Sequence, residues 1–368
     1  MEIQTNPTTE FETTQTTDPR EAKLKEIIER GRASMTTALG GIQQEFADRQ
    51  DMMVKPTAVD FMVKGRTIMP VIRDQAYRLT GHSQGQVLQR AGIPSQFASR
   101  LMDLEENDLL RQNLKRLTER TQEEGILIRQ VGETIKGWLS PAYKRMDAAP
   151  VMEAFLKRSV EKGFVPYRGM NTDYRYQIAV IQPRVWEPME DEFVIFGTSL
   201  ITGDYGNQSF EIDLLMLRIV CLNLAIGYDM FRRIHLGSRF QMEEGEEIIP
   251  ISQKTIKLDT ETISSAITDV VDASENHIKF LECKVQEASD KEIKDPKSIY
   301  DTIRKRGIRK EIVDQIKAAY DLPQEVEILP KGNNLWRLSN AISLVARGVE
   351  RPDDKVDLEK EAMNLLIG

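Results

Sequence analysis

Cationic and aromatic side chains are interleaved between positions 136 and 176 in a way that few other parts of the chain show. Proteins that bind single-stranded nucleic acid combine positive charge along the phosphate backbone with aromatic rings on which bases stack. A strand at YRYQIAVIQ would put Tyr174 and Tyr176 on one face and Arg175 on the other, so these three cannot all reach one ligand. Half-buried packing of the tyrosines is the structural alternative. The candidate contact residues are Lys136, Tyr143, Lys144, Arg145, Arg168, Tyr174 and Arg175.

A second group of cations surrounds Gly307, between two short helices that the sequence predicts. Its members are Arg304, Lys305, Arg306, Arg309 and Lys310. Such a turn can hold phosphates through its side chains and through the N–H groups of a helix N-terminus. The alternative is a solvated loop. A phosphate contact here predicts binding that weakens steeply with salt.

The segment 207–239 is apolar on every side over its first half, which predicts a buried helix. A charge within it must be paired or used, because burying an unpaired charge costs several kcal/mol. Arg218 therefore either pairs with an acid, bonds carbonyls at a strand end, or faces a ligand. Asn223 is expected to be a cap or loop anchor, and His235 lies in the basic end of the segment. The acids considered as partners of Arg218 are Glu187, Asp191, Glu192, Asp204 and Asp213.

The sequence contains no recognisable catalytic apparatus. The three histidines, His82, His235 and His277, are widely spread, without a paired-Cys or HExxH spacing that would hold zinc. No serine or cysteine elbow motif is present. We therefore assign no catalytic residue, no metal and no cofactor. One alternative stays open, in which an acidic group holds Mg²⁺ in a nuclease. That group is Glu187, Glu190, Asp191 and Glu192.

Composition points to a soluble, globular protein of the cytoplasm. The 368 residues are 40% hydrophobic and 29% charged, the net charge is −8, and no apolar run reaches the roughly 20 residues of a membrane span. The first twenty residues lack the pattern of a secretory signal. Cys221 and Cys283 lie in apolar contexts, which favours a reducing compartment. Residues 125–184 carry ten Lys and Arg against five Asp and Glu, so the middle of the chain is locally basic.

The elements that position these residues follow from periodicity and turn residues. Residues 1–20 are expected to be disordered, and a helix at 22–30 is expected to stop at Gly31. Strands are expected within 55–74, where a turn at Gly65 separates two of them, on either side of a hairpin at Gly132, and at 174–182 and 192–202. Helices are expected at 85–91, 95–104, 108–123 and 149–162, in a long element from Ile263, and at 297–305, 310–320 and 334–348. This order predicts an α+β protein.

Five segments appear in an order that resembles a phage- and plasmid-like family, the domain of unknown function 932. They are GWLSPAYKRMD (137–147), GTSLITGDYGNQSF (197–210), LRIVCLN (217–223), RIHLG (233–237) and NNLWRLSNA (333–341). The resemblance covers roughly residues 60–350 and implies a gene carried on a prophage, plasmid or other mobile element. This chain has Leu222, Leu224 and Leu236 where that family usually has small or polar residues. If those polar groups line a site, the site is altered here.

A more remote resemblance is to single-strand annealing proteins of the RecT, Redβ and Erf kinds. It implies a small curved antiparallel sheet packed with helices, ATP-independent annealing, and a homo-oligomer on single-stranded DNA. We expect that sheet in an α+β core domain at 21–245, between a tail at 1–20 and a helical region at 246–368. The expected function is single-stranded DNA binding or annealing in recombination or replication. The alternatives are a structural or interaction protein of a mobile element and a metal-dependent nuclease.

Overall fold

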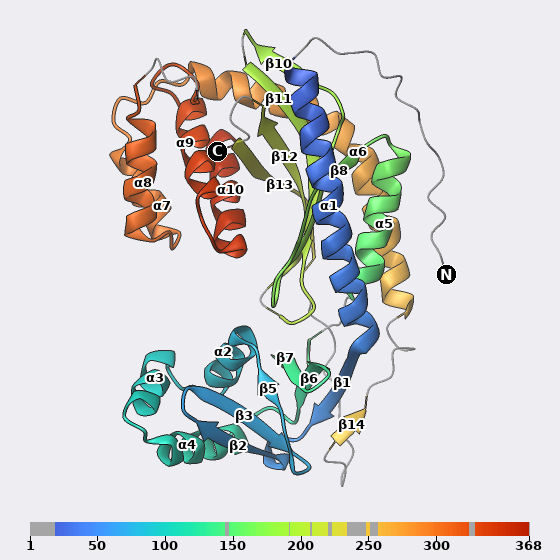
Figure 1. The fold of residues 1–368 in the computed structure, drawn as a ribbon, viewed down its shortest axis with the longest axis vertical. Coiled ribbons are helices and arrows are strands. Elements are labelled where there is room, and N and C mark those ends of the chain that lie inside the picture. Colours follow the sequence, from blue (N-terminus) through green and yellow to red (C-terminus); the bar gives the residue numbers. More distant parts are fainter. Residues whose placement is uncertain are drawn as a thin grey trace.

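The computed structural model describes residues 19–143, 147–190, 192–206, 208–219, 223–233, 248–250, 257–323 and 328–367. Figure 1 shows a small lobe of short strands and helices below a large lobe built on one long twisted sheet. The small lobe comprises 49–139 and 248–250, and the large lobe comprises the other described residues. Small, mainly antiparallel sheets packed with helices confirm the expected α+β class, and the helical region at the end of the chain is confirmed as well.

The small lobe contains two sheets, ordered β14-β1-β6-β7-β5 and β2-β3-β4. Its hairpins turn at Gly65 and Gly132, whose φ angles of +57° and +58° lie in a region that glycine adopts without steric cost. Both expected turns are confirmed. The strands are β1 (Arg49–Val54), β2 (Val59–Lys64), β3 (Thr67–Ile72), β4 (Gln75–Ala76), β5 (Arg78–Leu79), β6 (Ile126–Val131), β7 (Thr134–Leu139) and β14 (Ile248–Pro250). The helices are α2 (Gly81–Arg90), α3 (Ser95–Asp103) and α4 (Asn107–Glu119).

The large lobe is organised by an antiparallel sheet of order β13-β12-β11-β9-β8, with β10 paired to β11. Its central strands are buried on both faces because helices cover the sheet on either side (Figure 1). The strands are β8 (Val165–Asn171), β9 (Tyr176–Ile181), β10 (Trp186–Met189), β11 (Glu192–Thr202), β12 (Phe210–Arg218) and β13 (Asn223–Arg233).

The prediction of a buried helix within 207–239 is wrong, because the described part of this segment forms the hairpin of β12 and β13. Every residue of β12 is buried, since β11 and β13 flank it and helices cover both faces. A strand buried on both faces reads as a continuous apolar run, which periodicity cannot distinguish from a buried helix. Arg218 and Asn223 are therefore cross-strand partners at the turn end of the hairpin, rather than residues on opposite sides of a helix.

Helix α1 (Pro19–Asp48) runs along β8 and continues far beyond the expected stop at Gly31. A Cβ atom on Gly31 would lie 2.5 Å from the carbonyl oxygen of Pro166 and 2.7 Å from Cα of Tyr167. Glycine at this position is therefore a requirement of close helix–strand packing, not a helix terminator. Of the disordered tail expected at 1–20, positions 1–18 lie outside the described residues, and positions 19 and 20 are helical as the start of α1.

Substituting Gly31 by Ala should destabilise the protein by about 1–3 kcal/mol or more, because the new methyl group would overlap the backbone of β8. Gly40→Ala is a matched control in the same helix, since no atom lies within 4 Å of its Cβ position. The control should gain up to about 1 kcal/mol from helix propensity. Denaturant unfolding measures both, and equal midpoints for the two variants would contradict the packing account.

The remaining helices belong to the large lobe, where four contact the sheet and two pack on other helices. They are α5 (Ala148–Glu161), α6 (Lys257–Asp290), α7 (Lys297–Lys305), α8 (Lys310–Tyr320), α9 (Leu335–Arg347) and α10 (Pro352–Ile367). One hydrophobic cluster joins Val194, Phe196 and Met216 of the sheet to Trp336, Ile342 and other side chains of α6–α10.

Strand β14 pairs with β1 across almost two hundred residues of sequence. The division at 20 and 245 stays a prediction. No helix among the described residues is long and apolar enough to span a bilayer.

Candidate nucleic-acid interface

The connection between α7 and α8 places five exposed cations on a tight turn, which we call the basic turn (residues 304–310). Helix α7 ends because Gly307 adopts φ +96°, and α8 restarts at Lys310. No side chain caps the N-terminus of α8, so its first backbone N–H groups point toward solvent or a ligand. The cations are Arg304, Lys305, Arg306, Arg309 and Lys310, and all five are exposed.

Two of these cations already have carboxylate partners. The Nη1 atom of Arg306 lies 2.5 Å from Glu361, and Nη2 of Arg309 lies 3.4 Å from Asp354 in a pair that is mostly exposed. Within the described part of the chain, no carboxylate is within ion-pair distance of Arg304, Lys305 or Lys310. The turn therefore has a surplus of positive charge that faces water, as expected for a phosphate-binding surface.

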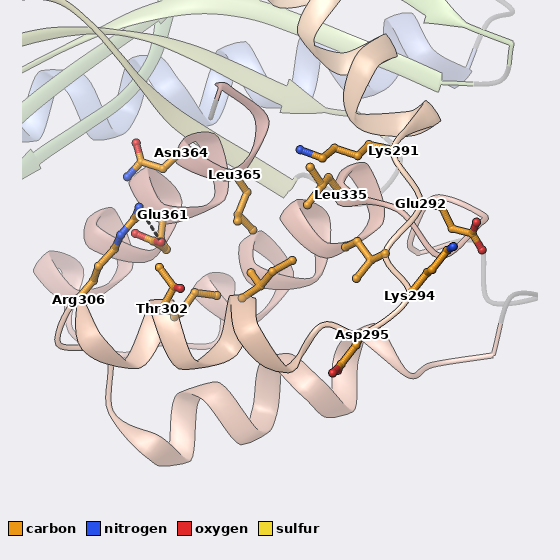
Figure 2. Close-up of a pocket in the computed structure, with 13 residues that line it drawn as sticks. Lys291, Glu292, Lys294, Asp295, Thr302, Arg306, Leu335, Glu361, Asn364 and Leu365 are labelled. Carbon is orange, nitrogen blue, oxygen red and sulfur yellow. Dashed lines mark hydrogen bonds and ion pairs between the residues drawn. The ribbon is translucent and has the colours of Figure 1, made fainter.

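A groove of about 410 Å³ lies beside the basic turn, between α7, α10 and the 291–295 connection. Its walls are mainly aliphatic and include Ile299, Ile303, Leu335 and Leu365. Figure 2 shows the Arg306–Glu361 pair at one end, and Glu292, Lys294 and Asp295 at the other. Arg306 thus belongs to both the basic turn and the groove. A recess that combines apolar surface with polar side chains is typical of ligand sites.

The cations of the 136–175 segment are held by carboxylates instead of forming an open groove. Lys136 lies 2.7 Å from Glu45, and its side chain is 16% exposed. Arg168 makes a bidentate contact of 2.5 and 2.8 Å with Glu359 on α10. Arg175 lies 3.0 Å from Asp357 and 3.6 Å from Asp353. The expected contact of these three cations with nucleic acid stays a prediction. Their charge is largely compensated within the protein.

The aromatic candidates occupy the junction of the lobes. Tyr143 packs against Met53, Leu127 and Leu139, and its hydroxyl lies 3.4 Å from the carbonyl oxygen of Gly203. Tyr174 is half-buried in the turn before β9, where its ring stacks on His82 of α2 at 4.8 Å. Lys144, Arg145 and His235 lie outside the described residues, and so does the side chain of Asn223. The structure therefore brings Tyr174 to His82, which the sequence did not identify as a partner.

His82 connects the lobes through its ring as well, because Nε2 lies 3.0 Å from the carbonyl oxygen of Tyr205. Burial lowers the pKa of His82 below its ordinary value of 6.5, while the hydrogen bond to the Tyr205 carbonyl and the charges of Asp173 and Asp353 act in the opposite direction. The neutral ring should therefore contribute stability above pH 6.5 that is lost as pH falls through the lowered pKa. An NMR titration of the His82 ring should give a pKa below 6.5. A pKa above 6.5 would mean that the Tyr205 carbonyl and the two carboxylates together outweigh burial.

Arg218 is a structural residue in the arrangement observed. Its Nε and Nη2 atoms contact both carboxylate oxygens of Glu192 at 2.7 and 3.1 Å, and Nη1 donates to the carbonyl of Ile328 at 3.1 Å. The reading that pairs Arg218 with a nearby acid is confirmed. The carbonyl that Arg218 bonds belongs to a turn between α8 and α9 and not to a strand end. Glu192 also belonged to the acidic group considered for Mg²⁺, and Arg218 now occupies both of its oxygens.

The sequence did not reveal a buried ionic cluster that joins the lobes, which we call the ionic junction (Arg49, Asp51, Arg129, Asp147 and Asp204). Arg129 lies 3.0 Å from Asp51 and 2.7 Å from Asp147, and its Nη1 donates to the backbone carbonyl of Asp204 at 2.8 Å. Arg49 bridges Asp147 and Asp204. A signal was present, because Arg129 interrupts the apolar strand ILIRQV. Its two carboxylate partners, Asp51 and Asp147, lie 78 and 18 residues away in the sequence.

The geometry of the ionic junction fits a structural role. Burial raises the pKa of Asp204, and the neighbouring guanidinium groups of Arg49 and Arg129 oppose that rise. Every member has a hydrogen-bonded partner, so the cluster offers no free group for chemistry. Among the described residues, no group of three or more His, Cys, Asp and Glu side chains is arranged to hold a metal ion. Asp191, a member of the acidic group considered for Mg²⁺, lies outside the described residues.

Comparison with known proteins gave no match, whether to a family model, to a curated protein or to a solved structure.

Proposed function

We propose that this protein binds single-stranded DNA without ATP and that the basic turn is the surface that holds the phosphate backbone. The observation that carries the proposal is the exposed surplus of charge at Arg304, Lys305 and Lys310, next to the uncapped N-terminus of α8. Charge elsewhere in the chain supports the proposal less, because Lys136, Arg168 and Arg175 are paired with carboxylates. We therefore place the interface on α7 and α8 rather than on the hairpins around position 140.

The proposal includes a role in recombination or replication on a mobile element, and assembly into a homo-oligomer in the host cytoplasm. The resemblance of the ordered segments to the phage- and plasmid-like family supports the genetic setting. Exposed apolar side chains at one corner of the small lobe support contact with another protein molecule. They are Phe97, Leu104 and Leu109, which are 47%, 62% and 46% exposed.

The same exposed side chains favour a second candidate function, an interaction protein that binds no nucleic acid. Titration of labelled single- and double-stranded oligonucleotides at two salt concentrations, with the mass measured in parallel, separates the two. DNA binding predicts retention at low salt, loss at high salt and preference for the single strand. The absence of any retention at low salt, with only protein recovered in a pull-down, would favour the interaction protein.

A further inference from the structure

The groove beside the basic turn is shaped for one planar, partly apolar group that lies close to a phosphate chain. Arg306 is the C-cap residue of α7, so it stands at the exit of the basic turn and at the end of the groove. Figure 2 shows its guanidinium directed toward Glu361 of α10. A strand whose phosphates follow Arg304 and Lys305 would therefore pass the mouth of the groove.

The polar end of the groove offers a hydrogen-bond donor and an acceptor side by side. Arg306 donates to Glu361 through Nη1 alone, and its side chain is 50% exposed, so its other N–H groups remain accessible. The Glu361 side chain is only 7% exposed, and within the described residues its Oε2 atom has no hydrogen-bond partner. Arginine and glutamate are the side chains that donate to and accept from base edges in nucleic-acid complexes.

Next to this polar end the groove has an aliphatic patch, and the groove is large enough for a base. Ile299 of α7, Leu335 of α9 and Leu365 of α10 form this patch beside a volume of about 410 Å³, and Ile303, which also belongs to the lining, is fully buried. Each unpaired base has a donor and an acceptor next to each other on its Watson–Crick edge, and a flat apolar body behind that edge. In a duplex the same edge is already bonded to the opposite strand, and exposing it costs a few kcal/mol.

We infer that the groove receives one unpaired base of a single strand whose phosphates lie on the basic turn. This inference rests on the proposed function and adds to it the reason for single-strand preference. Arg306 and Glu361 bond the base edge, and Ile299, Leu335 and Leu365 cover its faces. Because all four bases present a donor beside an acceptor, the groove selects single strands without selecting sequence.

Three 12-nucleotide probes with equal phosphate spacing test the inference by fluorescence anisotropy at low salt: a mixed-sequence single strand, a fully abasic strand and a duplex. The base-bearing single strand should bind about tenfold more tightly than the abasic strand, given the usual contribution of one held base. The duplex should show no such gain in affinity over the abasic strand, when affinity is counted per strand. Thr302→Trp fills the groove from an exposed position on α7. It should reduce the affinity for the base-bearing strand to the affinity for the abasic strand.

Thr36→Trp is the matched control, because Thr36 and Thr302 are both exposed helical threonines whose hydroxyls donate to the carbonyl four residues earlier at 2.9 Å. The control should keep the tenfold difference. Equal affinity of wild type for the base-bearing and abasic strands overturns the groove inference and leaves the proposed function standing. A groove that binds an aliphatic side chain of a protein partner would give that same equality. Failure of both strands to bind overturns the proposed function and the inference together.

Discussion

Replacing Arg129 by Ala should cost about 3–5 kcal/mol of unfolding free energy, because it leaves buried carboxylates without their cation. The Arg129 side chain is fully buried, and it holds Asp51 of β1 and Asp147 at the start of α5 at the same time. Its loss should loosen the small lobe from the large one, since Asp147 and Asp204 anchor the large-lobe side of the ionic junction. Denaturant unfolding monitored by tryptophan fluorescence measures the change.

Arg120→Ala is the control, because Arg120 is exposed at the end of α4 and has no carboxylate partner in the described part of the chain. It should change the stability by less than about 0.5 kcal/mol. In the Arg129→Ala background, Asp51→Ala should cost less than it does in the wild-type protein, because its partner is already gone. Additive losses, or a loss below about 1 kcal/mol for Arg129→Ala, would show that the ionic junction does not hold the lobes.

Arg337→Ala should also destabilise strongly, by about 3 kcal/mol or more, because three backbone carbonyls lose their donor. Arg337 on α9 is completely buried and donates to the carbonyls of Tyr320, Leu322 and Pro330. Two of these carbonyls lie at the C-terminal end of α8, where helical partners are missing. The substitution should therefore loosen the helix that carries the basic turn.

Arg337→Met separates packing from hydrogen bonding, since it keeps most of the side-chain volume and removes every donor. It should recover only part of the loss, whereas Lys331→Ala, at an exposed side chain in the preceding loop, should be nearly neutral. Thermal unfolding of the three variants checks the order. Full recovery by methionine would mean that the three hydrogen bonds contribute little.

Local patterns predicted most of the elements, because their causes are local. The glycines at 65 and 132 identify their hairpins by the turn conformation that they permit, and the apolar stripe from Ile263 identifies α6. An ion pair between residues close in sequence could also be predicted, since Glu192 was among the acids named as partners of Arg218. The expectation failed for 207–239, where burial on both sides removed the alternation that distinguishes a strand.

The candidate site was harder to predict because pairing at long sequence separation decides which cations are free. Arg168 and Arg304 look alike in sequence, yet Glu359, 191 residues away, neutralises Arg168 while Arg304 faces water. The groove also depends on segments that are distant in sequence, because α7, α9 and α10 each contribute only part of its lining. No sequence pattern predicts which helices pack against one another.

The salt dependence of DNA binding tests the role of the basic turn most directly. The variant Arg304→Ala/Lys305→Ala/Lys310→Ala removes the three unpaired cations, and Arg100→Ala/Arg116→Ala/Arg120→Ala removes three exposed cations of the small lobe. For a 30-nucleotide oligothymidine, the slope of log affinity against log salt should become shallower by about 2 in the first variant, since each lost phosphate contact removes about 0.7. The second variant should keep the wild-type slope. Identical slopes for all three proteins would contradict phosphate binding by the basic turn.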